Sequence, residues 1–367
     1  MTGRKTRAVA ALRLRGVLLP DDVERDVFIV GDRLTFQPVP DAEMIADRGF
    51  VLPGLVDAHC HPGLKPGGGV VDSIDESREL ATIDRDAGVL TIRDAGSPVE
   101  YAELDDDPDM PRLIRAGRHL SAPRRYLPGV AVECTAAEVV EQAAVQAKAG
   151  NGWVKLVGDW IDRSTGDLGP TFDDATFAAA VAAAHDAGAR VAVHTFGEAA
   201  LPGLVAAGVD SVEHGTGLSL DLIAELARHR TALVPTMTNV EKFEGIASSA
   251  EAKFPRYAEH MRRLQAGFPH VVRAAYDAGV PIYVGTDAGG GVKHGLAAGE
   301  MAKLGALGIP PIDVLAAGSW GARDWLGLPG LTEGGLADLV VFPEDPRADL
   351  DALWHPHRIV LRGRVIK

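Results

Sequence analysis

The sequence predicts an α/β protein built as a (β/α)8 TIM barrel, with a small β-sandwich subdomain formed by the N- and C-terminal segments. Three observations support this: a repeated helix-to-strand phrase, short apolar runs without polar alternation, and eight such runs across residues 51–320. Continuous apolar runs are typical of parallel strands buried on both faces, and eight strand–helix units match a barrel in number and size. An open doubly wound sheet is the alternative.

The repeated phrase is a helix-like segment that ends at or near Ala-Gly, followed by a run rich in Val and Ile. It occurs as DAGVLTIRDAG from Asp86, KAGNGWVKLVGD from Lys148, DAGARVAVHT from Asp186, AAGVDSVEHG from Ala206 and DAGVPIYVGTD from Asp277. The glycines in these phrases fit the left-handed position that ends a helix; they are Gly88, Gly150, Gly188, Gly208 and Gly279. Each phrase therefore marks a helix end and the strand after it.

Three further apolar runs complete the count of eight strands. They are VLPGLVDAHCH (51–61), PRLIRAGRHLS (111–121) and TALVPTM (231–237). The sequence also indicates where two helices start. Thr135 with Glu138 makes a capping-box pattern, and Ser219 precedes the apolar periodic run LDLIAELARHR.

The two ends of the chain have a different pattern from the middle. Residues 8–37 and the tail (ADLVVFPEDP, then HRIVLRGRVIK) read as short strands separated by polar turns. Neither end has enough strands for a stable sheet, so we expect residues 1–50 and 330–367 to pair into one subdomain. Residues 51–329 then form the barrel.

Composition excludes several classes of protein. The chain has 367 residues, of which 46% are hydrophobic and 24% charged, as expected for a globular protein with a large core. Its 37 basic and 51 acidic residues give a net charge of −14, which argues against a nucleic-acid partner. A small molecule is the expected partner. A homo-oligomer is compatible with the sequence, which does not determine the oligomeric state.

Cysteine use and the N-terminus indicate a cytoplasmic protein. Two cysteines, Cys60 and Cys134, are too few for a disulfide framework and suit a reducing compartment. Basic residues at the N-terminus (Arg4, Lys5 and Arg7) could imitate a signal peptide, but Arg13 and Arg15 interrupt the apolar stretch that follows. The sequence contains no run of about 18 apolar residues, which is the length needed to span a membrane.

Polar side chains occur where the predicted strands end, which is the catalytic face of such barrels. His59 and His61 are two residues apart on strand one, so both side chains point to the same side. Two imidazoles on one side make half of a metal site. Other strand ends carry Asp94, Lys155, His194, His214 and Asp287.

Lys155 does not fit a two-metal site as an ordinary lysine, because its ammonium would be repelled by two divalent cations. If its amine has reacted with carbon dioxide, the resulting carbamate is an anion with two oxygens that can bridge two metals. The alternative is a lysine paired with a carboxylate such as Asp94 or Asp159.

Several motifs together resemble the amidohydrolase superfamily, in particular its imidazolonepropionase-like and prolidase-type members with a carboxylated lysine. These are PGLVDAHCH, WVKLVGD, VAVHTFG, SVEHG and VGTDAG, with the closing GGLADLVVF. The resemblance implies that His59 and His61 hold one metal and that His194 and His214 hold the second. It also implies that carboxylated Lys155 bridges the metals and that Asp287 ligates the first metal and shuttles protons.

The expected chemistry is hydrolysis of a carboxamide C–N bond, in a dipeptide, an N-acyl amino acid or a cyclic amide. A metal-bridging hydroxide would attack the carbonyl, and Asp287 would pass its proton to the leaving nitrogen. Zinc is the default for a His-rich site, and manganese or cobalt would also fit.

Other functions stay open at this stage. A mononuclear deaminase of the same superfamily uses His-x-His, His and Asp, and Glu198 could imitate its acid, although Glu198 also suits a helix start. A non-catalytic barrel scaffold and a phosphotriester hydrolase are further alternatives.

Substrate contacts are sought in the loops. After strand three lie Arg124, Arg125 and Tyr126, and after strand eight lie Lys293 and His294. Arg and Lys there could bind a substrate carboxylate. Prolidase-type relatives have Gly-Gly-His after strand three, where this chain reads Tyr-Leu-Pro-Gly, so dipeptidase specificity is in doubt. Residues 238–270 form either a lid or two surface helices.

Overall fold

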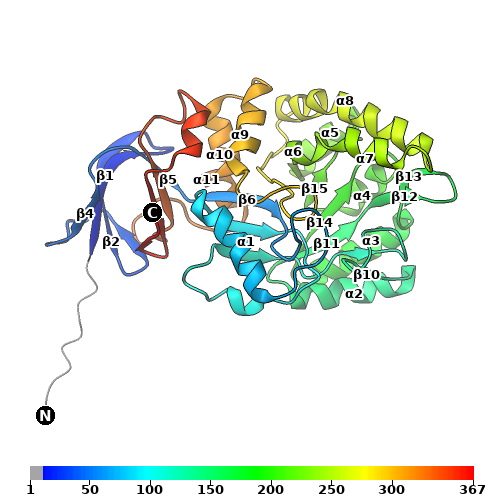
Figure 1. The fold of residues 1–367 in the computed structure, drawn as a ribbon, viewed down its shortest axis with the longest axis horizontal. Helices are drawn as coiled ribbons and strands as arrows, with labels where there is room; N and C mark the ends of the chain where they lie inside the picture. Colours follow the sequence, from blue (N-terminus) through cyan, green and yellow to red (C-terminus); the bar gives the residue numbers. More distant parts are fainter. Residues whose placement is uncertain (1–10) are drawn as a thin grey trace, which may run out of the picture.

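Parallel strands surrounded by helices make up the larger part of the fold, and a separate mixed sheet lies beside them (Figure 1). The structure is a computed structural model that describes residues 11–367, so Arg4, Lys5 and Arg7 lie outside the described residues. No helix in the described part of the chain is long and apolar enough to cross a membrane.

The parallel strands form two sheets that together follow the predicted barrel order. One sheet has three strands, and its members are β6 (Leu55–Cys60), β7 (Val89–Asp94) and β8 (Arg112–Arg115). The other has six strands in the order β10 (Val132–Glu133), β9 (Leu120–Ser121), β11 (Trp153–Val157), β14 (Arg190–Thr195), β15 (Ser211–His214) and β16 (Ala232–Val234). The predicted third strand, 111–121, is therefore divided between the two sheets.

The structure does not show the predicted closed barrel of eight regular strands, because the predicted eighth strand is irregular. Residues 281–287 are not a regular strand, although they lie between β16 and β6. A bridge joins Leu233 to Ile282, and the amide of Ala58 donates to the carbonyl of Val284 at 2.8 Å. Pro281 cannot donate to a ladder, and Asp287 has a φ of +58°, so regular pairing ends on both sides of this segment.

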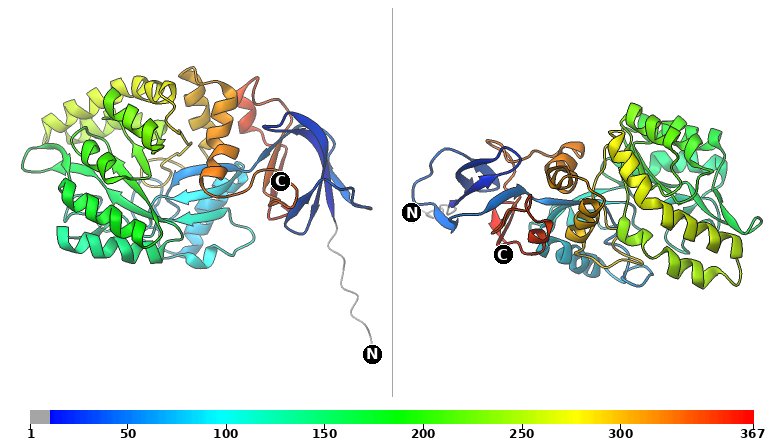
Figure 2. Two further views of the ribbon diagram at one scale, coloured as in Figure 1. Left: turned by 180° about the vertical axis from the view of Figure 1, so that it is seen from behind. Right: turned by 90° about the horizontal axis from the view of Figure 1, so that it is seen from above.

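Helices cover the outside of the parallel strands (Figure 2). They are α1 (Ile74–Asp86), α2 (Ala136–Ala149), α3 (Asp174–Asp186), α4 (Leu201–Ala207), α5 (Leu220–His229), α6 (Met237–Val240), α7 (Phe243–Ala250), α8 (Pro255–Asp277), α9 (Ala297–Ala306), α10 (Pro311–Gly318) and α11 (Trp320–Trp325). Short 3-10 turns occupy Ala102–Leu104 and Leu350–Trp354.

Helix boundaries largely follow the local sequence signals. Thr135 and Glu138 make the predicted capping box at the start of α2, and the Ser219 side chain caps α5. Four of the five predicted helix-ending glycines have positive φ, but Gly150 has φ −80° and ψ −170°. The prediction for Gly150 was wrong because the chain turns directly into extended backbone there.

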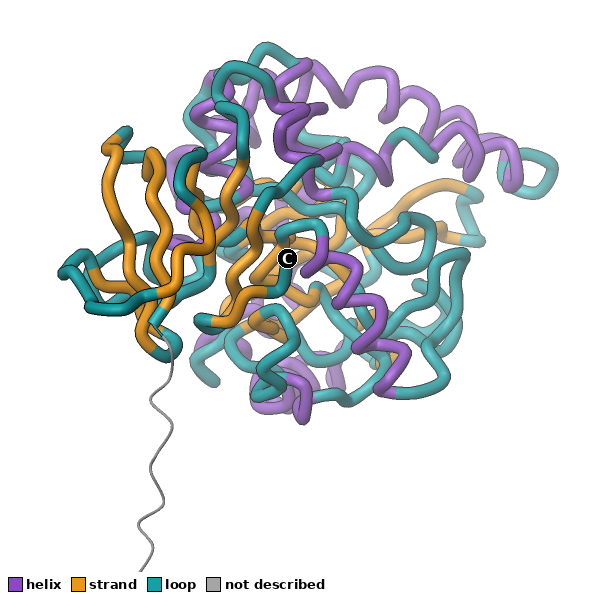
Figure 3. Tube along the Cα trace, turned by 60° about the vertical axis from the view of Figure 1, so that its left-hand side comes forward, coloured by secondary structure: helices purple, strands orange, loops and turns teal. Residues whose placement is uncertain are grey.

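The terminal segments form one mixed sheet of eight strands, seen at the left of Figure 3. Its strands are β1 (Leu12–Leu18), β2 (Val23–Val30), β3 (Arg33–Thr35), β4 (Glu43–Ala46), β5 (Phe50–Pro53), β17 (Leu339–Phe342), β18 (Arg358–Leu361) and β19 (Arg364–Val365). Strands from both ends of the chain lie in this sheet, because β5 pairs with β17 on one side and with β1 on the other, so residues 51–53 belong to this sheet and not to the first barrel strand. The strands belong to one continuous sheet, so the structure does not show two facing sheets of a sandwich.

The junction between β5 and β6 connects the terminal sheet to the site. Only Gly54 separates β5 from β6, and β6 carries His59 at its end. Because β5 is fixed by β17 on one side and β1 on the other, the terminal sheet holds the strand that supplies the first site residue.

Candidate metal centre

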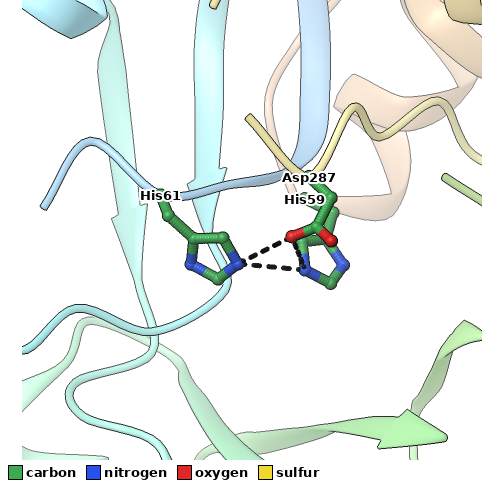
Figure 4. A group of neighbouring side chains, drawn as sticks. All are labelled: His59, His61 and Asp287. Carbon is green, nitrogen blue, oxygen red and sulfur yellow. Dashed lines mark hydrogen bonds and ion pairs between the residues drawn. The ribbon is translucent and has the colours of Figure 1, made fainter. Parts of the chain in front are cut away.

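His59, His61 and Asp287 lie together where β6 meets the irregular eighth segment (Figure 4). The two Nε2 atoms are 3.2 Å apart, and Oδ1 of Asp287 lies 3.2 Å from Nε2 of His59 and 3.1 Å from Nε2 of His61. Both imidazoles are buried, whereas the Asp287 side chain is 18% exposed. The group therefore faces an opening through Asp287.

The hydrogen bonds at the far side of each ring define what this group can bind. Nδ1 of His59 donates to Glu213 at 2.6 Å, and Nδ1 of His61 donates to the carbonyl of Gly96 at 2.8 Å. With Nδ1 protonated, both Nε2 atoms of neutral rings are acceptors. Two acceptors and a carboxylate oxygen cannot satisfy one another, so the arrangement fits a cation held between them.

Charges around the group favour a cation as well. Burial opposes protonation of His61, but the hydrogen bond and charge of Asp287 outweigh it and raise the pKa of His61. Burial would likewise raise the pKa of Asp287, yet the neighbouring His59 holds that pKa well below its usual range. The carboxylate is therefore ionised and available as a ligand.

Glu213 and Arg93 form a buried ion pair that contacts the Nδ1 side of the His59 ring. Arg93 donates to both carboxylate oxygens of Glu213 at 2.8 Å, and both side chains are almost completely buried. Burial would raise the pKa of Glu213, but the charges of Arg93 and Lys155 keep it well below its usual range. An ionised carboxylate on Nδ1 fixes the ring of His59 and increases the basicity of its Nε2.

His194 and His214 form a second pair on the neighbouring strands β14 and β15. Nδ1 of His194 lies 3.0 Å from Nε2 of His214, and Nδ1 of His214 lies 2.7 Å from the hydroxyl of Thr236. Burial lowers the pKa of each imidazole well below its ordinary value. Both rings are therefore neutral, which is the form that binds metals.

Backbone strain accompanies two of the predicted ligands. His214 and Asp287 have φ values of +64° and +58°, which non-glycine residues rarely adopt. In a regular strand Glu213 and His214 would point to opposite faces, whereas the left-handed turn at His214 lets both serve the site. Strain of this kind is concentrated at functional sites.

Lys155 is buried on β11 and lies in the same centre. Among the described residues its Nζ has no hydrogen-bond partner, so the alternative of a lysine paired with Asp94 or Asp159 is wrong. Asp94 accepts from Tyr101 and from the amide of Gly96, and Asp159 accepts from backbone amides. Burial lowers the pKa of Lys155 to about 8, so a neutral amine is accessible.

A pocket of about 370 Å³ opens in front of these side chains. Apart from His61, His194 and Asp287, its lining is apolar, aromatic or uncharged, and it includes no Lys or Arg among residues 11–367. Its side walls include Tyr126, Trp160, Phe196, Ile246 and Tyr257. The volume suits a small molecule.

The five candidate substrate contacts are placed differently from one another. Tyr126 lines the pocket. The Arg125 guanidinium pairs with Asp162 and donates to three backbone carbonyls, and Arg124 and Lys293 are exposed. The side chain of His294 is fully buried against Asp84. The structure therefore brings one of the five, Tyr126, to the pocket.

His294 belongs to a separate buried cluster with Cys60 and Asp84. Asp84 accepts from Nδ1 of His294 at 2.7 Å and from the amide of Gly295 at 2.6 Å, and the Cys60 thiol lies 3.5 Å from Asp84. These residue types can bind metals, but here each donor meets the carboxylate of Asp84. The cluster anchors the chain after Asp287 to helix α1.

The segment 238–270 is helical and contributes a wall of the pocket. It comprises most of α6, α7 and the first part of α8, and its pocket residues are Asn239, Ile246, Ser249, Ala250 and Tyr257. Glu198, the candidate deaminase acid, is held by His260 of α8 at 2.8 Å and by Arg263 at 2.8 Å. It therefore joins α8 to the loop before α4 and does not line the pocket.

Several site residues were not predicted from the sequence. Arg93, Glu213 and His119 lie inside strands or next to them, and Trp160 and Ile161 lie on the hairpin of β12 (Asp159–Asp162) and β13 (Asp167–Pro170). A charged residue within an apolar run, as in LTIRD or SVEH, was the available signal for Arg93 and Glu213. Such residues must be paired when buried.

Histidines, a lysine and an aspartate at the ends of parallel strands, beside a pocket, are arranged as in the active sites of barrel-type enzymes. The chain belongs to the amidohydrolase family, whose model matches residues 50–366. Such an enzyme acts on carbon–nitrogen bonds.

Relatives extend over nearly the whole chain. A Mycobacterium tuberculosis protein named only as uncharacterized is 49% identical over 361 residues, covering 98% of this chain and 96% of that protein. Among solved structures, a Xaa-Pro dipeptidase with bound methionine has a TM-score of 0.83 at 22% identity, covering 98% of this chain and 100% of the other. An A. niger ochratoxinase has a TM-score of 0.80 at 19% identity, with 98% and 96% covered. These structures share the fold.

Proposed function

We propose that this protein is a metal-dependent amidohydrolase that cleaves the C–N bond of a small, uncharged and largely apolar amide. The observation that carries the substrate class is the pocket, which joins the His61, His194 and Asp287 side chains to walls that, in the described part of the chain, contain no Lys or Arg. The family and the paired acceptors of the centre support the reaction class.

Six side chains would hold two divalent ions, with zinc the default and manganese or cobalt also suited. They are His59, His61, Lys155, His194, His214 and Asp287. The fit rests on atoms that lack partners in the described residues: Nζ of Lys155 and Nε2 of His194 are buried and make no hydrogen bond. Carboxylation of Lys155 would give it oxygen ligands. Bound ions would lower the pKa of water and polarise a carbonyl oxygen.

Asp287 is the residue that would move the proton. Its carboxylate is ionised and touches both His59 and His61, yet it also lines the pocket. It can therefore accept a proton from the attacking water and donate it to the leaving nitrogen on the pocket side. Its amide donates to the carbonyl of His59 at 2.7 Å, and the adjacent Thr286 is fixed by Asp57, which accepts from the Thr286 hydroxyl at 2.5 Å.

The pocket walls argue against substrates with a free carboxylate. Dipeptides and N-acyl amino acids carry such a group, and binding it normally requires a cationic partner. A Xaa-Pro dipeptidase has the same fold, but here Arg125 is occupied by Asp162 and the ammonium of Lys242 by the carbonyl of Gly291. Aromatic side chains instead favour aryl or alkyl groups, because burial of apolar surface drives their binding.

The mononuclear deaminase is the less favoured alternative. Its acid would have to be Glu198, and this carboxylate is bound by His260 and Arg263 outside the pocket. A deaminase also has no use for Lys155 at the centre of the site.

The test combines metal content with a substrate panel. Protein purified with bicarbonate is analysed for zinc, manganese and cobalt per chain, in the parent and in Lys155→Ala, with Lys303→Ala, at a partly exposed position of α9 paired with Glu241, as control. Neutral anilides and lactams are then compared with N-acetyl amino acids and dipeptides, following amine release. We expect about two metals in the parent and the control, one or none in Lys155→Ala, and turnover of neutral amides.

Two results would overturn the proposal. One metal per chain in both the parent and Lys155→Ala would remove the bridging role of Lys155 and favour the deaminase. Hydrolysis of the carboxylate-bearing substrates at least as fast as of their neutral counterparts would remove the substrate class.

A further inference from the structure

His119 is a buried histidine without any hydrogen bond. It is fully buried, and neither of its ring nitrogens has a partner among the described residues. Leaving such a buried polar group unsatisfied costs its full desolvation penalty. A site that keeps this residue is expected to supply it with a partner.

The strand register places His119 beside Lys155. Leu120 of β9 pairs with Leu156 of β11 in parallel, so the residues before them, His119 and Lys155, stand at the same level on adjacent strands. Both leucines pack in the same apolar core outside the barrel strands. Because side chains alternate along a strand, His119 and Lys155 point to the opposite, interior face. On its other side Lys155 pairs with Ala192, which offers only a methyl group.

The ring of His119 is held within the centre by its neighbours. Its centroid lies 5.2 Å from that of His61 and 5.0 Å from that of Tyr126. A Cβ on Gly96 would lie 2.6 Å from Nδ1 of His119, so only glycine allows this packing. The imidazole is therefore fixed between strand two and strand four, next to Lys155.

No hydrogen bond joins the two side chains. Nζ of Lys155 and both ring nitrogens of His119 are buried and lack a partner among the described residues, and an ammonium offers the imidazole N–H no acceptor. Carboxylation changes this balance: the neutral amine of Lys155 bonds to the carbon of CO2, one proton leaves to solvent, and the carbamate anion gains two acceptor oxygens.

We propose that His119 is a positioning residue that donates a hydrogen bond from its imidazole to the carbamate of Lys155 and so stabilises the carboxylated lysine. This inference rests on the proposed two-metal centre, because the carbamate is the bridging group of that centre. His119 touches neither the substrate nor the reacting atoms in this role. It supports a ligand from outside, as Glu213 supports His59.

The test measures carboxylation directly in the metal-loaded protein. Purified protein is titrated with 13C-labelled bicarbonate at constant pH, and the carbamate carbon is followed by NMR. Lys155→Ala, in which the resonance must be absent, assigns it. His119→Leu removes the donor, His119→Gln keeps one within reach, and His357→Leu, at an exposed position, is the control.

We expect His119→Leu to need at least about tenfold more bicarbonate for half-maximal carbamate signal than the parent and His357→Leu, since the charge-assisted hydrogen bond that favours the carbamate is lost. His119→Gln should recover part of this loss. If His119→Leu does not fold by circular dichroism, His119→Asn, whose amide is too short to reach, replaces it in comparison with His119→Gln.

The outcomes separate this inference from the proposed function. The role of His119 is overturned if the parent shows the carbamate signal and His119→Leu reaches half of its maximal signal at the same bicarbonate concentration. That result leaves the two-metal hydrolase intact. A parent without any carbamate signal overturns both. Unchanged carboxylation combined with a raised KM would assign His119 to the substrate, which also overturns the inference.

Discussion

Glu213 accepts a hydrogen bond of 2.6 Å from Nδ1 of His59, although the two residues lie 154 positions apart in the chain. The residue after Glu213 is His214, a proposed ligand of the second metal. One dipeptide at the end of β15 therefore contributes to both halves of the centre. Arg93 from β7 holds the carboxylate in place at 2.8 Å.

We predict that Glu213→Gln lowers metal affinity about 10- to 100-fold, which is the usual effect of removing the partner of a ligating histidine. The substitution removes the charge that orients His59 and leaves Arg93 buried without a counterion. Chelator competition, read by the metal remaining on the protein, measures this change.

The matched control is Glu225→Gln, because Glu225 is exposed on α5 and pairs with Arg228 far from the centre. It should bind metal like the parent. Equal metal retention in Glu213→Gln and Glu225→Gln would show that the Glu213 contact does not support the centre.

Gly285 gives a prediction about the irregular eighth segment. A Cβ at this position would lie 2.4 Å from Val234 and 2.7 Å from the Cβ of His59, so Gly285→Ala must displace the strand that carries the site. We expect roughly 1–3 kcal/mol lower stability from overpacking and weaker metal binding. Denaturant unfolding with and without metal tests both effects.

Gly267 supplies the opposite expectation in the same measurement. It is exposed in the middle of α8, and a Cβ there would meet nothing within 4 Å. Gly267→Ala should stabilise the protein by about 0.5–1 kcal/mol through helix propensity. A loss of stability in Gly267→Ala as large as that in Gly285→Ala would refute the close-approach argument.

Asp84 gives a third prediction, about the loop after Asp287. Asp84→Asn removes the charge that holds both His294 and the amide of Gly295. We expect faster hydrogen exchange in residues 288–295 and a stability loss of about 1–3 kcal/mol. Asp86→Asn, at an exposed position of the same helix, should leave exchange in that loop unchanged. If both variants exchange alike, Asp84 is not the anchor.

Residue order and spacing were enough to predict much of the fold and the centre. Parallel strands place their ends on one face, so the ligands on β6, β14 and β15 could be grouped without coordinates. The irregular eighth segment could not be predicted in this way. Its apolar run VPIYVG reads as a strand, but Pro281 and the left-handed turn at Asp287 prevent regular pairing.

The residues around the ligands depended on information that a single sequence does not contain. Glu213 was recognisable as polar within an apolar run, but its partners His59 and Arg93 come from other strands. His294 was expected at the substrate because it follows strand eight, yet its partner Asp84 lies 210 residues earlier. Arg125 was a candidate carboxylate binder until the structure paired it with Asp162 on the β12–β13 hairpin.

A fourth prediction concerns the two thiols. Burial raises the pKa of Cys134 to about 11, and burial with the charge of Asp84 raises that of Cys60 well above its ordinary value. At pH 8 both groups are protonated, and only thiolates react readily. A disulfide-exchange reagent should therefore titrate no thiol in the native protein at pH 8 and two after denaturation. Rapid native reaction of either thiol would contradict this burial.

The last prediction concerns the wall of the pocket and rests on the proposed function. Ile246 of α7 lines the pocket and is partly buried, whereas the nearby Lys242 directs its ammonium to the carbonyl of Gly291. A lysine there would bring an ammonium into a low-dielectric pocket, where its attraction to a carboxylate is stronger than in water. We expect Ile246→Lys to raise kcat/KM for N-acetyl amino acids at least about tenfold and to lower it for neutral anilides.

Metal content and the circular dichroism spectrum should stay at the parent values in Ile246→Lys, because Ile246 is not one of the proposed ligands. Ile312→Lys on α10, where the isoleucine is 39% exposed, controls for the added charge and should leave both substrate classes unaffected. An Ile246→Lys enzyme that keeps the parent's preference would mean that the acyl or leaving group does not contact this wall. The substrate would then have to bind along β12 and Tyr126 instead.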